Sequence, residues 1–282
     1  MFILNKLLVS EMNLNKLLLL LVLLFASGQT TVLFAQDQKG DLSGFAEDFE
    51  EDDEDEDNDD SDSGISEFFF WAMIENLDEF ASLWGKTPGT EYGPYPGFPY
   101  SVGNGFMTNG DDFRSFFFTT ELSYHYINDD LRSYLFKWET EFVNWSKLSF
   151  DLAVYEEQLF APSSERLRQK DYLTLMGLRY GVGIWRTPHV IFNIEGGYRS
   201  LNFNSGVGGP EIAVDFQFFP KMPLVIETKL SAAYVKRSPL YIVEASAGLA
   251  IGRLELLAGM RLMANKDLDV LNGFKLGLRL WY

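Results

Sequence analysis

The 282-residue sequence contains no cysteine. The chain therefore has no disulfide framework, no thiolate zinc site, no cysteine nucleophile and no lipidated cysteine. Bases are also scarce, with 23 Lys and Arg against 41 Asp and Glu. This balance excludes nucleic acid as a partner, because binding a phosphate backbone needs clustered cations. Beyond the N-terminal region no apolar run approaches the roughly 18 residues of a transmembrane helix, so a helical membrane protein is not expected.

The N-terminal segment has the pattern of a secretory signal peptide. Lys6 and Lys16 precede an uninterrupted apolar run at 17–25, and Phe34-Ala35-Gln36 resembles a cleavage site after Ala35. We therefore assign residues 1–35 to a signal peptide, with Met12 as an alternative start. An uncleaved membrane anchor is disfavoured, because the apolar run falls short of the roughly 20 residues that span a bilayer.

Residues 36–64 form a strongly acidic segment. Asp41 to Asp62 contains 14 acids and no base, and like charges at this density predict a disordered, extended linker. The segment could hold divalent cations loosely or attract a cationic periplasmic partner. The partner hypothesis fails if deleting residues 41–62 leaves every pulldown unchanged. A specific metal site is not expected, because the spacing differs from that of a calcium-binding loop.

Two further segments precede the main domain. Residues 65–84 carry Phe70, Ile74, Leu77, Phe80 and Trp84 at helical spacing, which predicts an amphipathic helix. Packing against the main domain is favoured over a place inside it or in a membrane interface, because no Lys or Arg flanks the apolar face. Residues 85–114 are rich in Gly, Pro and aromatic residues and are expected to be an irregular loop pinned to one end of that domain.

From residue 115 onward the hydrophobic period is two. In the last segment Phe274, Leu276 and Leu278 share one face, whereas Lys275 and Arg279 share the other. Ten segments of about 10 to 15 residues alternate in this way, which suits tilted membrane-spanning strands better than the five or six residues usual in soluble sheets. The sequence therefore predicts a closed antiparallel transmembrane β-barrel over residues 115–282, with about ten strands (8 to 12). A soluble two-sheet sandwich is the alternative.

The polar face of these segments carries both acids and bases. If the barrel is closed, this face points inward, where opposite charges must pair because they are removed from water. The predicted lumen charge network consists of Glu121, Lys137, Glu139, Glu141, Arg179, Glu195, Arg199, Glu227, Lys229, Glu244, Glu255, Arg261, Lys275 and Arg279.

The chain from about residue 115 onward resembles the small bacterial outer-membrane β-barrel proteins, of the kind of the OmpA transmembrane domain. The resemblance rests on the terminal run, which alternates and ends in an aromatic residue, like the C-terminal insertion signal of that class: Phe274, Leu276, Leu278, Leu280 and Tyr282. It implies a bacterial outer-membrane location, contact with outer-membrane lipid, and recognition of the C-terminal strand by the barrel-insertion machinery. It also implies periplasmic tight turns at 144–147, 186–188, 220–223 and 252–253, longer outer loops at 159–170, 204–209 and 265–269, and a periplasmic N-terminal region.

Three functions remain open at the level of sequence. A structural or interaction role is favoured, because a barrel of this size is largely filled by its own side chains. A narrow channel or small-ligand carrier is the alternative, since small inward residues such as Gly177, Gly183 and Gly248 would widen the lumen locally. A lipid-modifying enzyme is the third, because Glu121, Ser123 and His125 share one strand face; neighbours on one extended strand seldom form a triad, so we expect no catalytic residues. No sequence motif indicates a cofactor.

Overall fold

The computed structural model describes residues 41–47, 49, 98–101, 105–106, 116–142, 145–160, 168–203, 206–236, 238–266 and 270–282. Contacts divide the chain into residues 1–39 and residues 40–282, and the described residues belong to the second unit. The predicted signal peptide and the predicted helix at 65–84 lie outside the described residues. None of the helices described is long and apolar enough to cross a membrane.

Ten strands follow one another along the chain, in agreement with the alternating segments of the sequence. They are β1 (Phe116–Tyr126), β2 (Leu131–Phe142), β3 (Ser146–Phe160), β4 (Arg168–Arg186), β5 (Val190–Asn202), β6 (Gly206–Lys221), β7 (Leu224–Val235), β8 (Ser238–Ile251), β9 (Leu254–Ala264) and β10 (Val270–Trp281).

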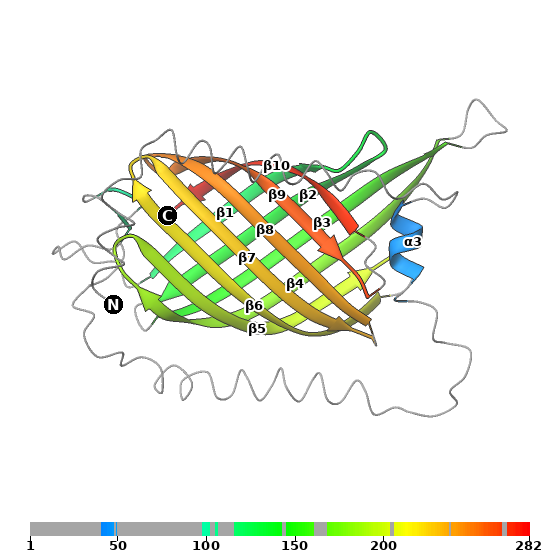
Figure 1. Ribbon diagram of the computed structural model, residues 1–282, viewed down its shortest axis with the longest axis horizontal. Helices are drawn as coiled ribbons and strands as arrows, with labels where there is room; N and C mark the ends of the chain where they lie inside the picture. Colours follow the sequence, from blue (N-terminus) through cyan, green and yellow to red (C-terminus); the bar gives the residue numbers. More distant parts are fainter. Residues whose placement is uncertain are drawn as a thin grey trace. The chain divides into compact units, whose positions relative to one another are not determined.

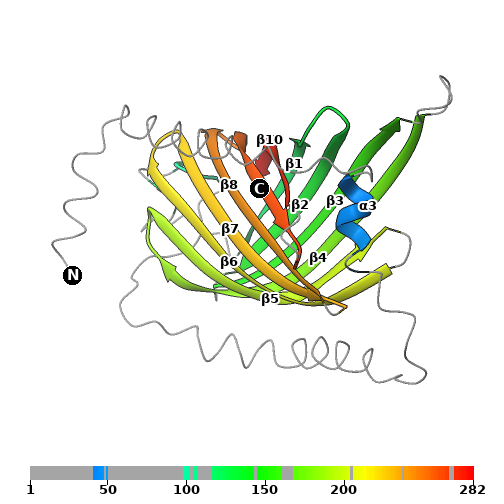
Figure 2. The ribbon, with the colours of Figure 1, turned by 45° about the vertical axis from the view of Figure 1, so that its right-hand side comes forward.

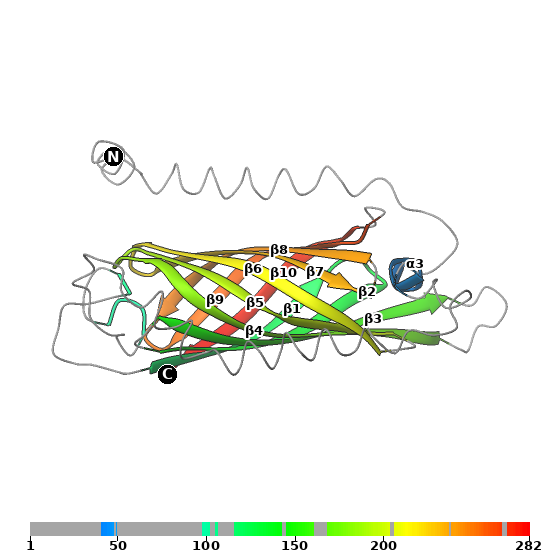
Figure 3. The ribbon, with the colours of Figure 1, turned by 90° about the horizontal axis from the view of Figure 1, so that it is seen from below.

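The strands form a closed antiparallel barrel. Each strand pairs with its neighbours in sequence, and β10 returns to pair with β1. The strands run diagonally to the barrel axis, as Figure 1 and the rotated views in Figures 2 and 3 show. Closure excludes the sandwich alternative, and it leaves no unpaired sheet edge.

The two ends of the barrel differ in their connections. At one end, here the turn end, β2–β3, β4–β5, β6–β7 and β8–β9 are joined by short turns at 143–145, 187–189, 222–223 and 252–253. At the other, the loop end, the connections include 127–130, 161–167, 203–205 and 265–269. The four tight turns and the loops at 161–167, 203–205 and 265–269 overlap the predicted segments, although β6 already begins at Gly206 within the predicted loop 204–209. The connection at 127–130 and the two-residue connection between β7 and β8 at 236–237 were not predicted.

A short helix corrects the prediction of disorder for part of the acidic segment. α3 (Asp41–Glu47) is helical and lies at the loop end of the barrel, next to the ends of β3 and β4 (Figures 1 and 2). Leu42, Phe45 and Phe49 are buried there. The prediction considered only charge density, whereas these three apolar side chains at helical spacing gain burial against the barrel.

The turn end is covered by residues from the predicted Gly/Pro/aromatic loop. Phe106 stacks on Phe219 with ring centroids 5.1 Å apart, and its amide donates to the carbonyl of Pro188 at 2.7 Å. Gly105 has φ +132°, and a Cβ there would lie 2.2 Å from the same carbonyl oxygen, so only glycine fits. Tyr100 donates its hydroxyl to the carbonyl of Leu224, and burial raises the pKa of this phenol. Residues 98–101 and 105–106 thus contribute Tyr100 and Phe106 to a buried cluster at this end of the barrel.

Candidate functional site

All fourteen residues of the predicted lumen charge network are buried and face the interior of the barrel. None has more than 8% of its surface exposed. A water-filled pore would leave its lining side chains accessible, so this low exposure shows that the side chains themselves fill the lumen.

The layer nearest the loop end is organised by two arginines. Arg199 holds Asp151 through both guanidinium nitrogens, at 2.9 and 3.1 Å, and bonds to Glu211 at 2.8 Å. Arg179 bonds to Glu195 and to Glu211, each at 3.0 Å, and also pairs with Asp151. The Arg199–Asp151 pair is bidentate, and bidentate guanidinium–carboxylate pairs have a fixed geometry, so we expect this layer to be rigid.

The next layer is organised by two lysines. Lys147 Nζ lies 2.6 Å from Asp215, 3.1 Å from Glu139 and 3.1 Å from Glu195. Lys229 reaches the same two glutamates, at 3.3 Å from Glu139 and 3.0 Å from Glu195. Glu195 also binds Arg179, so it connects this layer to the arginine layer.

A third group lies across the β1–β10 seam. Glu121 accepts from Lys275 at 2.9 Å and from Arg279 at 2.6 Å. Arg279 also pairs with Glu227, and Glu244 pairs with Lys137 and with Lys275. These contacts lock the closing strand pair from inside the barrel.

Several of these ion pairs cross the lumen between strands that are not neighbours. Lys137 on β2 meets Glu244 on β8, Lys229 on β7 meets Glu139 on β2, and Lys147 on β3 meets Asp215 on β6. A void of about 10 Å³ lies among Lys137, Asp151, Arg179, Arg199, Lys229, Ser231, Ile242 and Glu244. Such a void holds about one water molecule. The ion pairs therefore bridge the lumen from wall to wall and leave little space among them.

The inward glycines serve a different purpose from the one proposed from sequence. A Cβ on Gly177 would lie 2.7 Å from the guanidinium nitrogens of Arg179 and Arg199, and a Cβ on Gly248 would lie 1.9 Å from Glu255 Oε1. The space left by the missing side chains is therefore occupied by the ends of charged side chains. These glycines do not widen a passage.

Several members of the network were not predicted from the sequence. Lys147, Arg186 and Glu211 are buried in ion pairs, but the sequence placed the first two in turns and the third beside a loop. The strands in fact extend through them. Lys147 lies four residues before Asp151 on β3, so alternation continued to the start of this strand places Lys147 on the same inward face.

The outer face of the barrel is apolar and is bounded by aromatic residues. Exposed aliphatic side chains occupy the middle of the strands, among them Leu122, Met176, Leu178, Leu230 and Leu276. Exposed aromatic residues gather towards both ends: Phe116, Phe142, Trp185 and Tyr282 at the turn end, and Tyr126, Tyr134, Tyr172, Tyr234 and Tyr241 at the loop end. An apolar band between two aromatic girdles is the arrangement of a barrel that spans a bilayer.

The five residues of the predicted C-terminal insertion signal all point outward. Phe274, Leu276, Leu278, Leu280 and Tyr282 are exposed on the barrel wall. The ring of Tyr282 stacks on Phe118 with centroids 4.5 Å apart, and its amide donates to the Phe118 carbonyl at 3.0 Å. The last residue therefore also helps to close the barrel at the β1–β10 seam.

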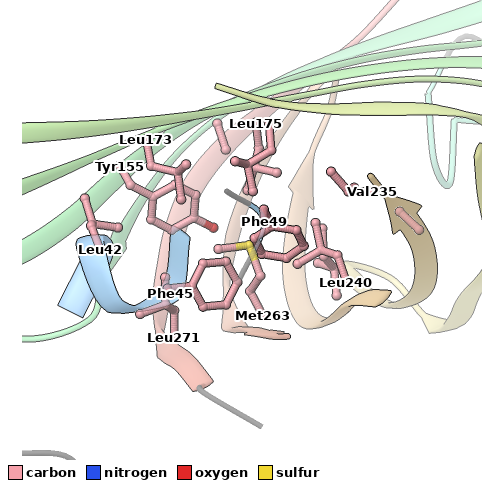
Figure 4. Close-up of a cluster of buried hydrophobic side chains, with 14 of the residues drawn as sticks. Leu42, Phe45, Phe49, Tyr155, Leu173, Leu175, Val235, Leu240, Met263 and Leu271 are labelled. Atoms are coloured by element: carbon pink, nitrogen blue, oxygen red, sulfur yellow. The ribbon is translucent and has the colours of Figure 1, made fainter. Parts of the chain in front are cut away.

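The inward face changes from charged to apolar at the loop end. We call this region the loop-end cup; it consists of Leu131, Leu135, Ala153, Tyr155, Leu173, Leu175, Leu201, Ala233, Val235, Leu240, Ile242, Met263 and Leu271. Leu42, Phe45 and Phe49 pack into it, as Figure 4 shows. The amide of Leu42 donates to Glu157 Oε2 at 3.1 Å. The cup was not predicted from the sequence, because its residues alternate in phase with the charged residues of the same strands.

The three residues considered for a hydrolase triad are not connected as a triad. Ser123 Oγ donates to Glu121 Oε1 at 2.5 Å. The Nδ1 atom of His125 instead lies 3.3 Å from Ser133 Oγ on β2. A serine nucleophile needs a hydrogen bond to its base, whereas Ser123 donates to the acid of the three, Glu121, and His125 contacts Ser133.

No protein-family model and no curated protein matches this chain. Solved structures do resemble it. The outer membrane protein Ail of Yersinia pestis is 11% identical, with a TM-score of 0.33, over 59% of this chain and 99% of Ail. The outer membrane protease OmpT of Escherichia coli is 8% identical, also with a TM-score of 0.33, over 59% of this chain and 96% of OmpT. CdiB from Acinetobacter baumannii is 11% identical with a TM-score of 0.29, and the match spans only 39% of CdiB. The chain is itself a closed ten-stranded antiparallel barrel, and structures that resemble it include outer-membrane β-barrels.

Proposed function

We propose that this protein is a closed, non-conducting outer-membrane β-barrel with a structural or interaction role. The observation that carries the proposal is the charge network, whose ion pairs cross the lumen between opposite walls. The apolar outer band between aromatic girdles supports contact with membrane lipid. A narrow channel is disfavoured, because an ion would have to separate buried pairs in order to pass.

We infer the orientation of the barrel in the membrane from the lengths of the connections at its two ends. We place the turn end in the periplasm, because short turns face that side in outer-membrane barrels. In the proposed orientation, residues 98–101 and 105–106 lie on the periplasmic side. α3 lies at the opposite end of the barrel from these residues, and the periplasmic location of the N-terminal region stays a prediction.

The first prediction is the absence of steady conductance in planar bilayers. The same result is expected after deletion of residues 41–49, because the ion-pair layers beneath α3 stay in place. Unboiled gel mobility serves as the control for folding of both proteins. A stable conductance of the intact chain would contradict the proposal. Conductance only after the deletion would identify α3 as the gate of a channel.

We also propose that the barrel is not a lipid hydrolase, since Ser123 and His125 bind other partners. Fatty-acid release from phospholipid vesicles is expected to be the same for the wild-type protein, Ser123→Ala and His125→Ala. Hydrolysis that both substitutions abolish in a protein that still shows the folded gel mobility would establish an enzyme instead.

We propose that the C-terminal strand is recognised by the barrel-insertion machinery. Tyr282→Ala is expected to slow assembly in vesicles that contain this machinery and to leave unassisted folding into lipid nearly unchanged. Phe118→Ala is the matched control, because it removes the same ring stack but leaves the terminal residue. If both variants assemble at the same rate, Tyr282 acts only through the stack.

A further inference from the structure

The loop-end cup has a polar floor. On β9, Arg261 is the next inward residue below Met263, and on β8, Glu244 is the next below Ile242. The void of about 10 Å³ borders Ile242 from below, with Lys137, Arg179, Arg199 and Lys229 against only two acids, Asp151 and Glu244, in its lining. An apolar region thus meets a layer of buried, charged side chains, whose cations also pair with acids outside this lining, such as Glu195 and Glu211.

Two buried groups at this boundary have spare hydrogen-bonding capacity. Arg261 has 1% of its surface exposed, and its Nε and Nη1 atoms form no hydrogen bond of good geometry with described residues. Its Nη1 atom lies 3.1 Å from Glu244 Oε1. Tyr155 is fully buried, and its hydroxyl likewise lacks a partner of good geometry among those residues. Buried donors without acceptors are costly, and a bound water, ion or polar ligand group commonly satisfies them.

The present occupant of the cup is small. α3 has only seven residues, too few for a helix that is stable by itself, and it is held mainly by Leu42, Phe45 and Phe49. Leu42, Phe45 and Phe49, all apolar, fill the upper cup (Figure 4). An alkyl chain could replace these side chains, and a terminal carboxylate could accept hydrogen bonds from the floor.

We infer that the loop-end cup is a binding site for a fatty carboxylate, whose alkyl chain replaces Leu42, Phe45 and Phe49 and whose carboxylate binds Arg261 and Tyr155. α3 is then an internal substitute for this ligand. The inference goes beyond the proposed structural role and requires no conductance, so the two can fail independently.

The experiment measures the release of α3 directly. Because the chain has no cysteine, Gly44→Cys gives a single site for a nitroxide spin label, and a Cβ there meets no atom within 4 Å. The labelled full chain in phosphatidylcholine nanodiscs is titrated with decanoate and, separately, with decanol. Decanoate is expected to mobilise the label at a concentration roughly tenfold lower than decanol, because hydrogen bonds to a charged group are the stronger ones.

Tyr155→Phe provides the test of the headgroup contact. The substitution removes a hydroxyl that has no partner of good geometry, so the fold is expected to persist, whereas the decanoate midpoint should rise roughly tenfold. Tyr241→Phe is the matched control, because Tyr241 is exposed on the outer wall, and it should leave the midpoint unchanged. Equal effects of decanoate and decanol, no release by either, or a label that is mobile before any addition would each overturn the inference.

Discussion

Arg179→Met is expected to lower the free energy of unfolding by about 3–5 kcal/mol, the usual cost of removing one partner from a buried ion pair. Arg179 is buried and binds Asp151, Glu195 and Glu211. Methionine keeps most of the side-chain length but leaves these carboxylates with one cation fewer. The measurement is the urea midpoint of unfolding in lipid vesicles, together with the temperature at which the fast unboiled gel band disappears.

The matched control is Arg132→Met. Arg132 pairs with Glu156 at 3.0 Å, but its side chain is 35% exposed, so the loss should stay below about 1 kcal/mol. Arg179→Lys should fall between the two, because it keeps the charge but cannot bind three carboxylates in a fixed fork. If Arg179→Met and Arg132→Met cost the same, the lumen is hydrated, and the network does not hold the barrel together.

Leu230→Arg is expected to destabilise the protein in a bilayer by about 2–4 kcal/mol, the cost of an arginine on the lipid face near the membrane midplane. Leu230 is exposed on the outer wall near the middle of β7 and pairs with Val214 and Val243. A guanidinium there would have to leave water for hydrocarbon. The quantity to measure is again the free energy of unfolding in lipid vesicles.

Ile251→Arg is the control for depth. Ile251 is even more exposed, but it lies at the turn end, beside Gly252, where an arginine can reach the lipid headgroups and should cost about 0–1 kcal/mol. Equal, small effects at both positions would mean that the apolar wall does not face lipid, and the proposed membrane location would have to be abandoned.

Residues that precede β1 cover both ends of the barrel. Phe106 and Tyr100 pack at the turn end, whereas Phe45 and Phe49 pack at the loop end. The charged layers lie between these two apolar clusters, which shield them from water at either end. This arrangement explains how so many ionised side chains can be buried in one small barrel, since each layer is both internally paired and capped.

Much of the fold could be read from local patterns. Alternation along ten segments from residue 116 onward separates an apolar face from one that carries most of the charges, and the length of the segments favours a closed membrane barrel over a sandwich. The same alternation is enough to place Glu121, Lys275 and Arg279 on the inner face. The tight turn at Gly252-Arg253 was also recognisable, because turn residues mark it.

The pairing partners were decided by the tertiary structure. Lys137 and Glu244 come from strands on opposite sides of the barrel, separated by 107 residues, and the two-residue period of a strand contains no information about which opposite residue it meets. The apolar cup and the burial of α3 within it could not be predicted either. Leu173 and Ile242 point to the same side as charged residues of their own strands, so alternation does not distinguish an apolar end from a charged middle. Sequence alone determined which way each side chain points, since that depends on neighbours along one strand. Only closure of the barrel determined what each side chain meets there, since that depends on the register and tilt of all the strands together.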